Sequence, residues 1–173
     1  HTQAGEVQEV PYDLDVSGVT VLVYDGGYPR TTHVDFQGRV IAHETSFRAD
    51  HPTHVSGTIG GAGIADPRYR GMAPGVTIHA YGYDPAGTGF ILYDDVGDLE
   101  ADYTEAINTF GCQISNNSIG SNVERNEFPC ALQGDYGVTS QLIDGIVRGS
   151  LSGGQPFRIL WAGGNERGGD VCD

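Results

Sequence analysis

Short apolar runs alternate along the chain with segments of helical periodicity. The first run, residues 19–24, is continuously apolar and rich in β-branched side chains, which is typical of a strand buried on both faces of a parallel sheet. Further strands are predicted in four other runs, 39–42, 77–81, 113–116 and 157–162, of which the last two are bounded by glycine or a polar loop. The pattern therefore indicates a series of short, buried strands.

The segments between the later runs carry apolar residues at the spacing of a helix. Five of them recur at i, i+4, i+7, i+8 and i+11, on one helical face: Leu99, Tyr103, Ala106, Ile107 and Phe110. A second stripe of four follows: Leu142, Ile143, Ile146 and Val147. We expect Asp98 to cap the first helix, and Thr139 or Ser140 to cap the second. Strands that alternate with helices predict an α/β fold with a doubly wound, mostly parallel sheet, in which sites form at the carboxyl ends of strands.

Length and charge narrow the functional classes. The chain has 173 residues, about the size of one domain. Its 23 Asp and Glu residues against 9 Lys and Arg residues give a net charge of -14, so attraction to nucleic acids or anionic membranes is disfavoured. No segment approaches the roughly 20 apolar residues that a membrane-spanning helix needs. We therefore expect no nucleic-acid partner and no membrane.

Candidate catalytic groups lie at the end of the first strand and at the start of a helix. Asp25 follows the strand and precedes two glycines, so it either closes a turn or presents a functional carboxylate. His51 begins a helical segment with Pro52 in its first turn, where a missing N–H is tolerated. A carboxylate that binds one imidazole nitrogen leaves the other able to accept a proton from a nucleophile. Asp25 and His51 together therefore predict a general-base pair.

Two other residues have both a structural and a functional interpretation. His54 lies three residues after His51, a spacing that suits a shared metal ion, but no complete ligand set is visible and a structural histidine is the simpler interpretation. Asn165 follows the last apolar run, where it either forms a turn or donates a side-chain hydrogen bond to a developing oxyanion. Both alternatives stay open from the residues alone.

These motifs resemble those of the subtilisin-like serine peptidases, the subtilase family (peptidase family S8). Three of them match in the order of the family: the Asp strand 21–27, the His helix 51–58 and the oxyanion strand 162–165. The segment 70–75 is similar to the family's loop after the His helix, and 114–120 to the strand that lines its substrate cleft. The resemblance covers about Val19 to Glu166 and implies a subtilisin-like α/β fold.

The resemblance implies a role for each candidate residue. Asp25 would orient the imidazole, His51 would act as general base and then general acid, and Asn165 would bind the oxyanion. An extended polypeptide substrate would pair with the backbone of small residues, which let its own backbone come close. The substrate-binding residues implied are Gly87, Thr88, Gly89, Ser118, Ile119, Gly120, Ala162 and Gly163. The activity implied is that of a serine endopeptidase that forms an acyl-enzyme.

The family's nucleophile lies downstream of the oxyanion Asn, in a Gly-Thr-Ser-Met-Ala type motif, and residues 1–173 contain no such motif. Ser140 precedes Asn165, which is the wrong order, and we interpret it as part of a helix cap. We expect residues 1–173 to be the N-terminal portion of a subtilase catalytic domain, whose C-terminal remainder supplies the serine. This portion alone is then expected to be inactive.

Two other functions stay open. The first is a catalytically inactive subtilase-like binding or scaffolding module, which agrees with the absent serine and with Pro52, where the family usually has glycine. The second is a nucleotide-binding α/β domain that uses the turn after Tyr24. The absence of a G-x-G-x-x-G motif at that turn weighs against it.

Cysteine usage and acidic loops bear on compartment and metals. The cysteines lack the spacing of a metal site, and we expect a secreted, extracellular protein. Cys112 and Cys130 form either a disulfide or a pair of buried free thiols. The predicted chemistry requires no cofactor and no metal ligand is assigned. A structural calcium ion agrees with the resemblance, but we interpret Asp84, Asp94 and Asp95 as solvated carboxylates.

Overall fold

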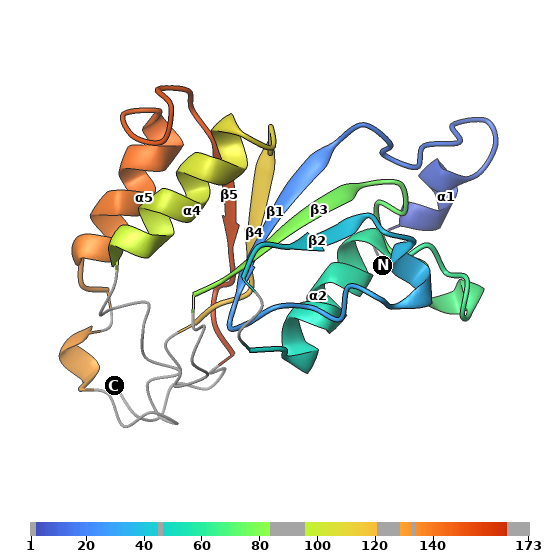
Figure 1. Cartoon of the computed structure of the whole chain (residues 1–173), viewed down its shortest axis with the longest axis horizontal. Coiled ribbons are helices and arrows are strands. Elements are labelled where there is room, and N and C mark those ends of the chain that lie inside the picture. The colour runs from blue at the N-terminus through green and yellow to red at the C-terminus, as the bar shows by residue number, and fades with distance from the viewer. Residues whose placement is uncertain (1–2, 45–46, 84–95, 121–128, 133, 166–173) are drawn as a thin grey trace.

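The fold is organised around a five-stranded parallel sheet (Figure 1). The computed structural model describes residues 3–44, 47–83, 96–120, 129–132 and 134–165. The strands are β1 (Thr20–Asp25), β2 (Val40–Ala42), β3 (Thr77–Gly82), β4 (Ile114–Asn117) and β5 (Arg158–Trp161). They lie in the order β2-β3-β1-β4-β5, and each neighbouring pair is parallel. The sheet confirms the predicted α/β class, and each strand begins and ends within one residue of its predicted run.

Helices cover both faces of this sheet. On one face lies α2 (Asp50–Gly60), and on the other lie α4 (Val96–Asn108) and α5 (Val138–Arg148) (Figure 1). The remaining described elements are short: α1 (Ala4–Gln8) and the 3-10 turns η1 (Val34–Phe36), η2 (Pro67–Tyr69) and η3 (Cys130–Leu132).

The central strand β1 joins two hydrophobic cores, because successive side chains of a strand point to opposite faces. Leu22 and Tyr24 belong to the core that α4 and α5 cover. Val21 and Val23 belong to the core that α2 covers. Burial on both faces explains why this segment is a continuous apolar run, with no alternation of polar and apolar residues.

The direction of the strand order reverses beside β1. From β1 the chain passes to β2 and β3 on one side, and then crosses to β4 and β5 on the other. The covering helix changes face at the same crossing, from α2 to α4. Sheets with such a reversal form a crevice at the carboxyl ends of the strands beside it. Asp25, the last residue of β1, lies at this position.

Both predicted helix caps are wrong. Helix α4 begins at Val96, so Asp98 lies inside its first turn. Helix α5 begins at Val138 and its capping residue, Gly137, makes no side-chain cap hydrogen bond, so Thr139 and Ser140 also lie in the first turn. The apolar spacing marks the buried face of a helix, and it does not fix the residue at which the helix starts.

Cys112 and Cys130 are not paired with each other. Cys112 is a free thiol buried in the same core as Leu22 and Tyr24, and burial raises its pKa to about 12. Cys130 is exposed and disulfide-bonded. The two cysteines are therefore neither a disulfide with each other nor a pair of buried free thiols, the two interpretations that the sequence left open.

Candidate active site

Asp25 is the last residue of β1, and its side chain is only 4% exposed. Its Oδ1 atom accepts a hydrogen bond from the backbone N–H of Gly26 at 2.7 Å. The Nδ1 atom of His51 lies 2.8 Å from Oδ1 and 2.9 Å from Oδ2. Burial raises the pKa of Asp25, and the hydrogen bonds from His51 and Gly26 oppose that rise. The carboxylate is therefore held by two N–H donors in a largely dry position.

His51 is the second residue of α2, at the helix end that faces β1. Ala49 precedes the helix in an extended conformation, and Pro52 lies in the first turn as predicted. Because Nδ1 faces an acceptor-only carboxylate, we assign the proton to Nδ1 and the lone pair to Nε2. The imidazole side chain is 58% exposed, so a reactant can reach it.

A pocket of about 350 Å³ lies beside this pair. It is lined by α2 and by residues at and after the carboxyl ends of β4 and β5. The lining residues are His51, His54, Val55, Thr58, Ile59, Asn116, Ser118, Ile119, Gly120, Ala162, Gly164 and Asn165. Segments far apart in the sequence therefore meet at the crevice that the strand order predicts.

Most predicted site residues come together in this pocket. His51 and Asn165 line it, as do Ser118, Ile119, Gly120 and Ala162. Gly163 lies between two lining residues and is exposed, without lining the pocket itself. The predicted substrate-binding segment Gly87, Thr88 and Gly89 lies outside the described residues.

His54 lies nearly one turn after His51 on α2 and is exposed. It lines both the pocket above and a second cavity of about 400 Å³. The Nδ1 atom of His51 faces Asp25, and the group of close metal-ligating side chains found among the described residues contains neither histidine. The geometry therefore gives no support to a metal ion shared by the two rings.

A buried hydrogen-bond network behind the pocket was missed by the sequence reasoning. The Tyr103 hydroxyl donates to Oδ1 of Asn117 at 2.8 Å and lies 2.9 Å from Oγ of Ser115. The side-chain amide of Asn117 donates to Ser115 and, at 3.2 Å, to the backbone oxygen of Leu160. The network ties α4 to β4 and β4 to β5. Its signal in the sequence is polar side chains within a buried strand, which need hydrogen-bond partners.

Fold and site together define a class: a doubly wound parallel α/β domain with a buried carboxylate–imidazole pair where the strand order reverses. The chain belongs to the subtilase family. The model of that family, Peptidase_S8, matches residues 17–172. This match confirms the resemblance that the three motifs indicated.

Comparison with solved structures agrees on the fold. The chain is similar to a protein whose structure is titled "Structure of the Clostridium Perfringens CspB protease", with a TM-score of 0.59 and 15% sequence identity. The alignment covers 84% of this chain and 37% of that one, so this chain spans little more than a third of that protein's length. Comparison with curated proteins gives no match. Among the described helices, none is long and apolar enough to cross a membrane.

Proposed function

We propose that this chain supplies the general base and the oxyanion donor of a serine endopeptidase. Membership of the subtilase family supports serine peptidase activity as the class. The observation that carries the finer proposal is the 2.8 Å separation of His51 Nδ1 and Asp25 Oδ1, beside a pocket that Asn165 also lines. The hydrogen bond leaves the other imidazole nitrogen available for chemistry.

The proposed reaction proceeds in two acyl-transfer steps. His51 Nε2 accepts the proton of a serine hydroxyl as its oxygen attacks the peptide carbonyl carbon, and then delivers that proton to the departing amine. The Asp25 carboxylate stabilises the imidazolium that forms between these events. The Asn165 side-chain amide donates a hydrogen bond to the oxyanion of the tetrahedral intermediate. Water, activated by the same imidazole, then releases the acyl group and regenerates the serine hydroxyl.

The substrate proposed is an extended polypeptide. The two segments that would flank it, 118–120 and 162–164, carry small side chains at most positions and follow the parallel strands β4 and β5. Small residues allow a peptide backbone to approach closely and to add as a further strand. The peptide then runs past His51 and Asn165, which line the same pocket.

The serine is proposed to come from a C-terminal remainder of the same catalytic domain, with residues 1–173 forming its N-terminal portion. Ser140 is a poor substitute because it lies on α5, on the face of the sheet opposite to α2 (Figure 1). Leu160 and Trp161 are exposed on β5, at the edge of the described sheet, which supports further chain packing there. On this proposal, residues 1–173 alone are inactive.

We also propose that the protein is secreted. Cys130 is disulfide-bonded, and disulfides persist mainly in oxidising compartments such as the extracellular space. The proposed chemistry needs no cofactor, because the nucleophile, the base and the oxyanion donor are all side chains.

A fluorophosphonate probe tests the proposal on the whole protein of which this chain forms part. The probe phosphonylates a serine only where a base activates it. We expect mass spectrometry to locate one labelled serine outside residues 1–173, and expect His51→Ala to abolish the label. A label within residues 1–173 would contradict the proposed source of the serine. No labelled serine would favour an inactive binding module.

A further inference from the structure

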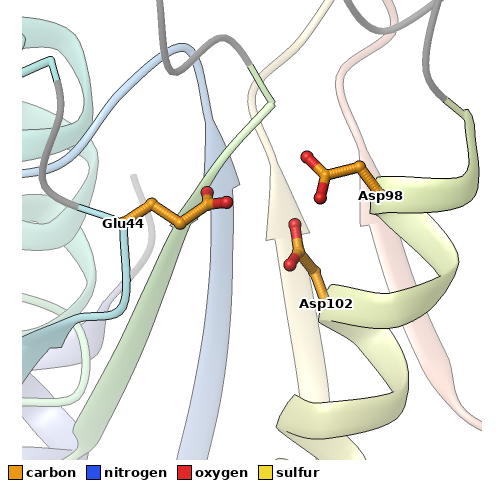
Figure 2. A group of neighbouring side chains, drawn as sticks. All are labelled: Glu44, Asp98 and Asp102. Carbon is orange, nitrogen blue, oxygen red and sulfur yellow. The ribbon is translucent and has the colours of Figure 1, made fainter.

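Three carboxylates from two distant segments of the sequence meet at the carboxyl-terminal side of the sheet. Glu44 lies two residues after the end of β2, and Asp98 and Asp102 lie one turn apart on α4. One carboxylate oxygen from each lies within 4.8 Å of the other two. Figure 2 shows Glu44 reaching across toward the two aspartates, which project from the same side of the helix.

One oxygen of the Asp102 carboxylate lacks the partner that a buried polar atom requires, although the side chain has a hydrogen bond with Tyr24. The residue is 8% exposed, and its Oδ2 atom is buried with no hydrogen-bond partner. Buried polar atoms are almost always satisfied, so an unpartnered oxygen on a carboxylate grouped with two others indicates a position suited to a cation. No Lys or Arg among the described residues forms an ion pair with Glu44 or Asp102.

Glu44 is held in place for this role. Its Oε2 atom accepts the backbone N–H of Gly82 at 2.6 Å, which fixes the side chain at the end of β3. Asp102 is buried, and Glu44 and Asp98 are half-buried. Three mutually repelling carboxylates are therefore gathered at a partly dry position, where positive charge would be strongly favoured.

We propose that Glu44, Asp98 and Asp102 bind a divalent cation of the calcium type. Calcium takes oxygen ligands at about 2.3–2.6 Å, so ligands on opposite sides of the ion lie up to about 5 Å apart, which matches this spacing. Magnesium, at about 2.0–2.1 Å, requires a tighter set. The absence of nitrogen or sulfur donors in the group disfavours zinc. Water would supply the coordination positions that the three side chains leave.

The ion would connect two segments that the sheet hydrogen bonds do not join directly. Glu44 follows β2, whereas the aspartates belong to the first turns of α4. Gly82, which donates to Glu44, is paired in register with Asp25 on β1. Calcium binding would therefore stabilise the edge of the sheet that carries Asp25. The inference does not depend on the proposed peptidase function.

Calorimetric titration of CaCl2 alone into chelator-treated protein tests the site, together with the Tm measured with and without millimolar CaCl2. We expect one Ca²⁺ bound per chain at this site and a rise in Tm. Asp102→Asn removes one negative charge from the site and leaves only a neutral amide oxygen, so it should weaken binding by about tenfold or more and abolish the rise in Tm. Glu100→Gln is the control, because it removes the same charge from α4 two residues away, on a different face of the helix. It should leave calcium affinity and the calcium-dependent rise in Tm unchanged.

Asp102→Asn should fold without calcium, because it also removes repulsion from a buried cluster. Glu44→Gln provides a second variant that should lose the same binding. Absence of binding at millimolar CaCl2, or equal binding by the parent protein and Asp102→Asn, would overturn the proposal. A third result would also overturn the proposal: a Tm that does not change with calcium but falls with rising pH in the parent protein and not in Asp102→Asn. That result would show that the carboxylates share a proton.

Discussion

Asp25 holds the ring of His51 through both carboxylate oxygens, at 2.8 and 2.9 Å from Nδ1. The contact joins the last residue of the central strand to the second residue of a helix. Strand β1 is paired on both sides, with β3 and β4, and α2 packs onto the sheet through Val55. The backbone of neither residue can shift without disturbing the core, so the two elements hold the pair at a preorganised separation.

Replacement of Asn165 by Ala should lower kcat of the whole enzyme with little change in KM. The side-chain amide would act mainly on the oxyanion, which exists only after attack. A loss on the order of 10²–10³ is expected, the size measured within this family for the equivalent donor of subtilisin. Steady-state kinetics on a peptide substrate measure it.

Gln141→Ala is the control for Asn165→Ala, since it removes an exposed side-chain amide from α5. It should leave kcat unchanged. A rise in KM for Asn165→Ala at constant kcat would mean that the residue contributes to ground-state binding and not to oxyanion stabilisation.

The stability of the chain should fall as the pH drops below about 6.5, because His43 and His79 form a pair in which His79 is buried and His43 is half-buried. His43 Nε2 lies 2.8 Å from His79 Nδ1, and the rings stack. Burial lowers the pKa of both from 6.5. As the pH falls, the unfolded chain therefore binds protons before the folded chain does. Each histidine that folding keeps neutral then lowers the free energy of unfolding by up to about 1.4 kcal/mol per pH unit.

Urea unfolding at a series of pH values measures this effect. The double variant His43→Gln, His79→Gln should flatten the decline below pH 6.5, whereas His54→Gln, at an exposed position, should retain it. An unchanged slope in the double variant would show that other groups set the acid sensitivity.

Cys112 should resist alkylation in the folded chain. It is buried and its pKa is raised to about 12, so almost no thiolate forms at neutral pH. Peptide mapping with iodoacetamide should label Cys112 only after unfolding, and Cys130 only after reduction. Rapid labelling of Cys112 in native protein would mean that this part of the core opens readily.

The sequence predicted the features that depend on local pattern. The apolar run at residues 19–24 predicts strand β1, and its place directly before Asp25 puts that residue at the carboxyl end of the strand. The position of His51 at a helix start follows from Pro52 and the residues after it. Parallel strands bring their carboxyl ends to one edge of a sheet, so these two residues could be expected to meet.

Features that depend on tertiary packing could not be predicted in this way. The meeting of Glu44 with Asp98 and Asp102 requires the start of α4 to lie near the segment that follows β2, and no local pattern predicts that position. The Tyr103 hydroxyl looks in sequence like part of an apolar stripe, and only the fold places it against Asn117. The predicted starts of α4 and α5 lie two or three residues after the observed ones, because neither helix begins at the side chain that was expected to cap it.

Asp25→Asn in the whole enzyme tests the central claim most directly. The amide would favour the wrong imidazole tautomer at His51, so kcat should fall on the order of 10⁴, the loss known for this substitution in a serine protease triad. The Tm should change little, because burial already disfavours the charged carboxylate, and Asp50→Asn, an exposed carboxylate beside His51, should retain activity. A folded Asp25→Asn enzyme with kcat within about tenfold of the parent would contradict a catalytic Asp25–His51 pair.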